Sequence, residues 1–166
     1  MIFKRLVVKR VAENHRGLFA DEDIKKGKKI LDFPGKILAE KKSNQWDLQI
    51  SKNKVIRTFS KNQINNFLNH SCEPNSFVKK IGNKFYLIAL KNIKKEDEIT
   101  FDYDTTDYDT ERFGLICTCK SENCRKKVRG FKYLNAKQKK RLEKYLIPYL
   151  KRIFEKEKSG KRIASA

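Results

Sequence analysis

The chain has 166 residues, 39% of them hydrophobic, and a net charge of +20 from 40 Lys and Arg against 20 Asp and Glu. The length and the eleven Phe and six Tyr exclude a disordered chain and favour one domain, or one domain with an appendage. The N-terminal residues carry charges throughout and contain no long apolar run. We therefore expect neither a signal peptide nor a membrane span, and an intracellular protein, cytoplasmic or nuclear.

Short apolar runs predict a series of short strands in the first two thirds of the chain. They lie at residues 6–11, 17–20, 28–33, 47–51, 54–59, 84–90 and 97–103. Turn signals at Pro34-Gly35 and Gly82-Asn83 separate some of them, and residues 62–71 predict one or two helical turns. This succession predicts a mostly β domain of the α+β class.

Residues 135–158 have a helical pattern instead. Apolar side chains recur at spacings of three and four from Leu142 to Ile153, which predicts an amphipathic helix with a basic outer face. Pro148 predicts a kink or the start of a second helix. Packing on the domain's own surface is the simplest role, and dimerisation or polyanion binding is the alternative.

The positive charge is concentrated at the same end of the chain. Residues 120–166 hold seventeen Lys or Arg and four acids, which accounts for +13 of the +20. Such a segment favours contact with nucleic acid or another polyanion. The alternative is a lysine-rich genome, since Lys, Asn and Ile are all plentiful.

The cysteines suggest a metal site. Cys117, Cys119 and Cys124 lie within eight residues, one thiolate short of the set that a structural zinc normally takes, and Cys72 is the only other cysteine. In a reducing compartment, such clusters bind metal more often than they form disulfides. Free buried thiols or a redox pair are the alternative.

Three separated segments carry a family resemblance. They are RGLFADEDIKKGKKI (16–30), FLNHSCEPN (67–75) and DEITFDYD (97–104), followed by the CxCxxxxC cluster. In this order they closely resemble the SET-domain family of protein lysine methyltransferases with a post-SET zinc motif. The resemblance implies a SET-domain fold of short curved sheets at residues 4–112, a post-SET zinc segment at 113–132 and a basic helical extension at 133–166.

The resemblance also implies the ligands of the metal. In this family Cys72, Cys117, Cys119 and Cys124 would together bind one structural zinc. Four thiolates leave no open position for a catalytic water, which agrees with an architectural role. The metal would fasten the segment after residue 116 against the NHSC loop and close a lid over the binding site.

The cofactor implied by the resemblance is S-adenosyl-L-methionine. The positions that would bind it are His15, Arg16, Gly17, Asn69, His70 and Tyr103. The chain departs from the family pattern in two places, because His15 replaces the first glycine of a Gly-x-Gly turn and Asn66 replaces an Arg before Phe67.

The resemblance makes Tyr103 the catalytic tyrosine, which would orient a neutral lysine amine for attack on the methyl group. An ordinary half-buried tyrosine of a strand is the alternative. Phe101, expected on the same face of that strand, matches a position that sets the product, and a phenylalanine there implies di- or trimethylation. The family's second channel tyrosine is missing; Trp46 is the aromatic residue nearest its place, and we expect Trp46 and Phe101 to line the substrate channel.

The expected function is therefore methyl transfer from S-adenosylmethionine to lysine on a basic, nucleic-acid-associated protein, histone-like or ribosomal. Residues 96–111 hold eight acids and no Lys or Arg, and this run could steer a basic substrate or merely offset neighbouring lysines. One alternative is a catalytically weak SET-like module that binds chromatin or nucleic acid through its basic end, which the departures at His15 and Asn66 favour. The other is a zinc-stabilised nucleic-acid binder without a cofactor.

Overall fold

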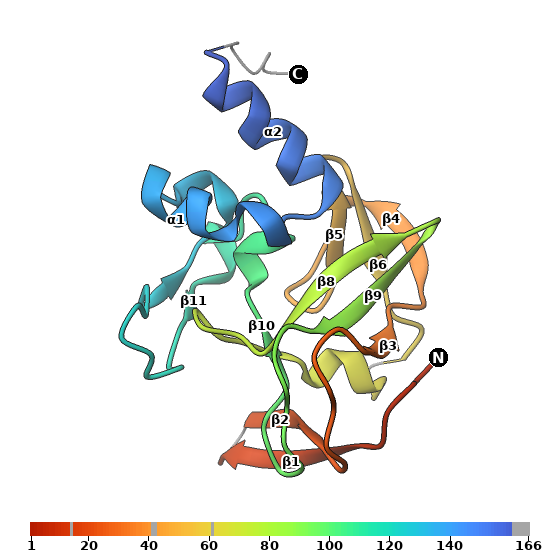
Figure 1. Cartoon of the computed structure of the whole chain (residues 1–166). Helices are drawn as coiled ribbons and strands as arrows, with labels where there is room; N and C mark the ends of the chain where they lie inside the picture. Colours follow the sequence, from red (N-terminus) through yellow and green to blue (C-terminus); the bar gives the residue numbers. More distant parts are fainter. Residues whose placement is uncertain (14, 41–42, 61, 161–166) are drawn as a thin grey trace.

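The computed structural model describes residues 1–13, 15–40, 43–60 and 62–160 (Figure 1). Small sheets dominate it. A hairpin of β1 (Leu6–Ala12) and β2 (His15–Ala20) lies at one end of the molecule, and the C-terminal helices lie at the other. Between them are two antiparallel sheets, one of β3 (Lys29–Asp32), β9 (Lys84–Ala89) and β8 (Ser76–Ile81), the other of β4 (Lys36–Ala39), β6 (Lys54–Arg57) and β5 (Leu48–Ser51).

The sheet of β3, β9 and β8 is the centre of the hydrophobic core. Phe85 and Leu87 of β9 and Val78 of β8 are buried, and the same core continues under the C-terminal helices. Gly82 turns the β8–β9 hairpin with φ of +57°, a conformation that glycine adopts without strain. The sequence pattern predicted β9 but not β8 or β4, because the exposed lysines of β8 and the short length of β4 conceal the alternation.

A two-residue parallel pair positions the candidate site. In it, β7 (Asn69–His70) runs beside β10 (Thr100–Phe101), so that the NHSC and FDY segments become neighbours. The prediction of one strand over residues 97–103 is wrong at both ends, since β10 covers only two of these residues and Tyr103 begins a 3₁₀ turn, η3 (Tyr103–Thr105). The Asp102 side chain caps that turn by accepting from the backbone N–H of Asp104.

The remaining short elements surround this pair. They are η2 (Ile64–Phe67), which confirms the predicted helical turn, η4 (Glu111–Phe113), β11 (Leu115–Ile116), β12 (Lys127–Val128) and η5 (Phe131–Tyr133). β11 and β12 pair as an antiparallel ladder that brackets the cysteine cluster.

The C-terminal segment folds as α1 (Ala136–Leu142), η6 (Glu143–Tyr145) and α2 (Pro148–Lys158). Pro148 starts the second helix, as one of the two predicted outcomes, because a proline fits the first helical position. Leu150 and Phe154 are buried in the domain core, which confirms packing on the domain's own surface. Within the described ranges, no helix combines the length and apolar character that a membrane crossing needs.

The start of α2 is also hydrogen-bonded to the segment that follows Tyr103. The backbone N–H of Ile147 donates to the carbonyl of Thr105 at 3.1 Å, and the Tyr149 hydroxyl donates to the carbonyl of Thr106 at 2.6 Å. Both threonines are buried, so these bonds satisfy carbonyls that water does not reach.

Candidate active site and metal centre

Two cavities meet at Tyr103. The larger, of about 470 Å³, is lined by four of the residues predicted to bind the cofactor, His15, Arg16, Asn69 and Tyr103. The smaller, of about 50 Å³, is lined by both predicted channel residues, Trp46 and Phe101, together with Tyr103. We call them the large and the small cavity. Tyr103 and Trp46 belong to both linings, so the two spaces adjoin at these rings.

Three segments of the chain approach one another closely beside the large cavity. The Asn69 side-chain amide donates to the carbonyl of Arg16 at 3.1 Å and to the carboxylate of Glu98 at 2.6 Å. A Cβ on Gly17 would lie 2.3 Å from that same Glu98 oxygen. A side chain at residue 17 would therefore displace this carboxylate from Asn69, and Gly17 does not itself line the cavity.

His15 is not in a turn. Residues 15–17 are part of β2, where His15 pairs with Ala12 of β1, and an extended residue needs no glycine. The departure from the family's Gly-x-Gly pattern thus costs the backbone nothing. Arg16 lies over the Phe67 ring at 4.4 Å, which holds the edge of the large cavity together.

Asn66, the second departure, holds a neighbouring loop. Its side-chain N–H donates to the carbonyl of Ser60 at 3.0 Å, and its side-chain oxygen accepts from the Thr58 hydroxyl at 3.1 Å. Asn66 lines both cavities. The substitution therefore gives the wall between them an amide where the family pattern has an Arg.

Tyr103 is held in one orientation. Its hydroxyl donates to the carbonyl of Leu68 at 2.6 Å, and its ring packs on Phe101 and His70 with centroids at 4.9 Å and 5.3 Å. Burial, with smaller contributions from nearby carboxylates, raises the pKa of Tyr103 well above its ordinary value. The hydroxyl is therefore a neutral hydrogen-bonding group at every physiological pH.

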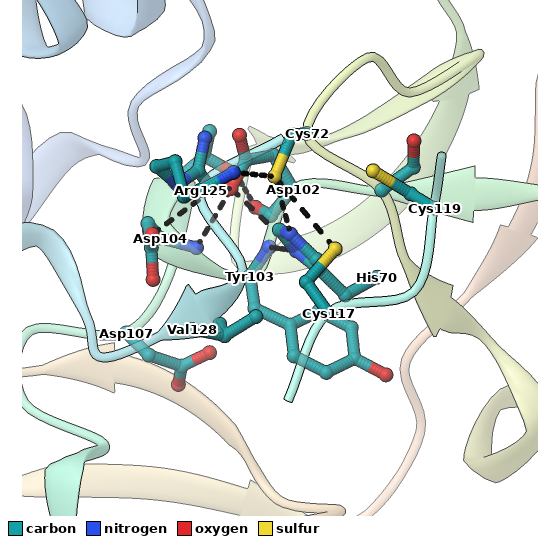
Figure 2. A network of polar contacts seen from close by, with 12 residues as sticks. His70, Cys72, Asp102, Tyr103, Asp104, Asp107, Cys117, Cys119, Arg125 and Val128 are labelled. Carbon is teal, nitrogen blue, oxygen red and sulfur yellow. Dashed lines mark hydrogen bonds and ion pairs between the residues drawn. The ribbon is translucent and has the colours of Figure 1, made fainter. Parts of the chain in front are cut away.

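His70 connects Tyr103 to the cysteines and does not line either cavity. Its Nδ1 accepts from the backbone N–H of Tyr103 at 3.1 Å, and its Nε2 lies 3.3 Å from Cys72 Sγ (Figure 2). Burial lowers the pKa of His70 to about 4, against an opposing effect of Asp102. The ring is neutral, with its remaining proton on Nε2 facing the cysteine sulfur.

The four predicted ligands come together. The Sγ atoms of Cys72, Cys117, Cys119 and Cys124 all lie within 4.8 Å of one another, and Cys72 and Cys117 are 3.8 Å apart. Four sulfurs around a tetrahedral zinc at about 2.3 Å would be separated by about 3.8 Å, so the set fits that metal. Burial raises the pKa of Cys72 to about 11, which a dication among the sulfurs would reverse.

Sequence reasoning missed Arg125, which ties the cysteine segment to the residues around Tyr103. One of its terminal nitrogens donates to Asp102 at 2.5 Å and to Asp104 at 2.9 Å, and all three side chains are at most 6% exposed (Figure 2). Its backbone N–H also faces Cys72 Sγ at 3.3 Å. In the sequence, Arg125 lies well after the acidic run that contains Asp102 and Asp104. Only the fold brings these three side chains together.

Replacing Arg125 with Met should lower the free energy of unfolding by about 3–5 kcal/mol, because two buried carboxylates would lose their counter-charge. Denaturant unfolding of the zinc-containing protein measures the change. Arg129→Met is the matched control, since its pair with Glu111 is solvent-exposed and should matter little. Equal stability of the two variants would mean that the buried cluster around Arg125 contributes no more to the free energy of unfolding than an exposed ion pair does.

The comparisons with known proteins agree with this geometry. A model of the SET domain matches residues 15–104, more than half of the chain. Among curated relatives, the variant-silencing SET domain-containing protein of Plasmodium falciparum is 33% identical over 142 residues, covering 73% of this chain and 6% of the relative. Histone-lysine N-methyltransferase trithorax of Drosophila virilis is 31% identical over 127 residues, covering 67% of this chain and 3% of the relative.

A solved structure shares the fold. KRYPTONITE in complex with mCHG DNA and SAH superposes with a TM-score of 0.65 at 28% identity, covering 76% of this chain and 29% of that one. The chain spans only a small part of the length of these relatives. The match over residues 15–104, which contain Tyr103, Asn69 and the pair of β7 and β10, shows that the chain belongs to the SET domain family.

Proposed function

We propose that this chain is a protein-lysine N-methyltransferase that transfers a methyl group from S-adenosylmethionine to a basic, chromatin-associated protein of the histone type. The observation that carries the proposal is the position of Tyr103 between a large and a small cavity. KRYPTONITE, which shares the fold, has been solved with SAH, mCHH DNA and an H3(1-15) peptide, and several relatives are named histone-lysine N-methyltransferases. These relatives favour a chromatin location.

In this proposal the large cavity holds the cofactor. Asn69, Arg16 and His15 line it from two segments and would contact the polar ends of the ligand. S-adenosylmethionine supplies a methyl group on a cationic sulfur, which needs neither a metal nor a covalent enzyme intermediate. The zinc that the four cysteines would hold has an architectural role, because four thiolates leave it no open position.

The small cavity would hold the substrate lysine. Its apolar rings, Phe101 and Trp46, fit the aliphatic stem, and the Tyr103 hydroxyl, fixed on the Leu68 carbonyl, lies where it can orient the amine. A lysine amine must be neutral to attack, and its ordinary pKa is about 10.4. Partial burial in this cavity and the approach of a sulfonium both favour the neutral form.

The direct test is incubation of the purified protein with methyl-labelled S-adenosylmethionine and either histones or ribosomes. Label on a lysine of a histone, located by mass spectrometry, is the expected result. Label only on ribosomal proteins would change the substrate class. Bound cofactor without label on any protein would refute the enzyme.

Phe101 leads us to propose di- or trimethylation. Its ring is buried against Tyr103 and presents no polar atom to hold a water beside the amine. Phe101→Tyr should shift the product toward monomethyl-lysine, because the added hydroxyl occupies the space of further methyl groups. The distribution of mono-, di- and trimethylated peptide, read by mass spectrometry at equal turnover, checks this. An unchanged distribution would show that another residue limits the product.

A second candidate, a nucleic-acid-binding module of weak activity, is favoured by the outer face of α1 and α2. Lys137, Lys151, Arg152 and Lys156 are exposed there. Contact with phosphates through this face would weaken steeply as salt rises. Tight, salt-sensitive DNA binding by a protein that labels no substrate would favour the module over the enzyme.

A further inference from the structure

The acidic run at residues 96–111 is not one surface facing a substrate. Asp102 and Asp104 are buried and form ion pairs with Arg125. Asp109 pairs with Lys132, and Glu111 pairs with Arg129. Glu96 pairs with Lys9, and Glu98 accepts from Asn69. Asp107 differs, because it lines the small cavity and forms no ion pair with any residue that the structure describes.

The backbone holds Asp107 firmly beside Tyr103. Its N–H donates to the carbonyl of Tyr103 at 2.9 Å, and its carbonyl accepts from the N–H of Phe131 at 2.8 Å. One carboxylate oxygen accepts from the Thr106 hydroxyl at 2.9 Å. In Figure 2 the carboxylate points away from the Arg125 cluster, and Asp107 shares the lining of the small cavity with Tyr103.

The charged groups that share a cavity lining with Asp107 already have ion-pair partners. Asp47, which also lines the small cavity, is paired with Arg57, and Asp104 is paired with Arg125. Three further charged groups share a second, smaller cavity lining with Asp107: Arg112 and Glu40, which pair with each other, and Asp109, which pairs with Lys132. The hydroxyls of Tyr103 and Tyr149, which also face Asp107, are neutral. Burial first, and the charges of Asp104 and Asp47 to a lesser degree, raise the pKa of Asp107 to about 7, although the Thr106 hydrogen bond opposes this.

We propose that Asp107 is a catalytic residue of the methyl transfer proposed above: its carboxylate binds the ε-ammonium of the incoming lysine in the small cavity and accepts one proton from it. This inference rests on the proposed function. The proton moves from nitrogen to a carboxylate oxygen, which leaves a neutral amine and a neutral acid. The nitrogen lone pair then forms the bond to the methyl carbon while the carbon–sulfur bond breaks and its electron pair stays on sulfur.

The Asp107 carboxylate would have two effects on a lysine in the small cavity: it would stabilise the entering ammonium, and it would accept a proton from it. A charged lysine enters an apolar space at a cost, which a counter-charge in the wall offsets. Once inside, the ammonium must give up its proton, and a positioned acceptor with a pKa near the working pH is efficient for this step. After transfer, Asp107 can return its proton to solvent through the mouth of the cavity, since it is only partly buried.

The test compares Asp107→Asn with Glu111→Gln, which removes the same charge from the same segment outside both cavities. On a histone substrate, Asp107→Asn should lower kcat/KM by a factor of about 10²–10⁴, and the control should not. The wild-type rate should level off above the pKa of Asp107, about 7, whereas the variant's rate should keep rising with pH as free lysine loses its proton. Cofactor affinity, measured by calorimetry, should be unchanged.

Stability gives a second, independent readout. A folded-state pKa above the ordinary value of an Asp means that the charged form is disfavoured in the fold, so wild type loses stability as pH rises from 3.8 to about 7. Asp107→Asn removes that loss and should melt at a higher temperature than wild type above neutral pH. A residue whose role is structural would show the opposite sign.

The outcomes are distinguishable. If Asp107→Asn has the wild-type rate and pH profile while Tyr103→Phe is inactive, the methyltransferase stands and this role of Asp107 is wrong. If Asp107→Asn loses activity equally at every pH and melts lower than wild type, Asp107 is a structural residue and the inference also fails. If wild type labels no lysine, the proposed function fails and the inference with it.

Discussion

Tyr103→Phe is expected to reduce methyl transfer by a factor of about 10²–10⁴ while the protein remains folded. The hydroxyl is the only polar group of the Tyr103 side chain, and this side chain lines both the large and the small cavity. Without it, the Leu68 carbonyl loses its donor at 2.6 Å and the amine loses a group that orients it. The fold should survive, because one neutral hydrogen bond contributes about 1 kcal/mol and the ring contacts to Phe101 and His70 are retained.

The effect of Tyr103→Phe is measured by steady-state rates of methyl transfer to a histone substrate, together with cofactor affinity by calorimetry. Tyr108→Phe is the matched control, since it removes a tyrosine hydroxyl five residues away that lines neither cavity. Equal activity of Tyr103→Phe and wild type would show that the Tyr103 hydroxyl has no role in the methyl transfer. Loss of cofactor affinity in Tyr103→Phe would place its effect in binding.

Zinc removal is expected to have the largest effect on stability. The purified protein should contain one zinc per chain, and its removal should lower the free energy of unfolding by several kcal/mol, since structural zinc sites contribute about 10–16 kcal/mol of apparent binding energy. The loss should reach the candidate active site, because Cys72 lies two residues after the end of β7 and His70 contacts both Cys72 and Tyr103.

Metal content by mass spectrometry and thermal melting with a chelator check this expectation. Cys119→Ser should reproduce the chelated state, because it removes one of the four sulfurs at a partly exposed position. Recovery of the original melting temperature on returning zinc, but not magnesium, is the control. Metal-free protein with four freely reactive thiols and an unchanged melting temperature would instead support the thiol alternative.

The sequence motifs predicted the parts of this site whose chemistry is encoded by residue type and order. The NHSC segment, the FDY segment and the cysteine cluster come together as expected, and Pro148 begins a helix as its ring geometry favours. The parallel pair that joins the first two segments is two residues long. Such a pair has no periodicity to detect, so only a family resemblance could anticipate it.

The residues that sequence reasoning missed are those whose role depends on distant partners. Glu98 and Arg125 were two more charges in a chain full of them until the fold placed one on Asn69 and the other between Asp102 and Asp104. The end of the predicted strand at Tyr103 was missed for a related reason. A side chain, that of Asp102, caps the following turn, and this competes with strand extension.

The hydrogen bonds between the start of α2 and the residues after Tyr103 connect the basic end of the chain to the segment that carries two residues of the candidate site, Tyr103 and Asp107. Thr105 and Thr106 lie between Tyr103 and Asp107, and their carbonyls are satisfied by Ile147 and Tyr149. The expected boundary at residue 133 therefore marks where the basic extension begins, but we expect the two sides of it to unfold together. A partner that binds the final helix, a nucleic acid included, would therefore also act on the loop that carries Tyr103, the proposed catalytic residue.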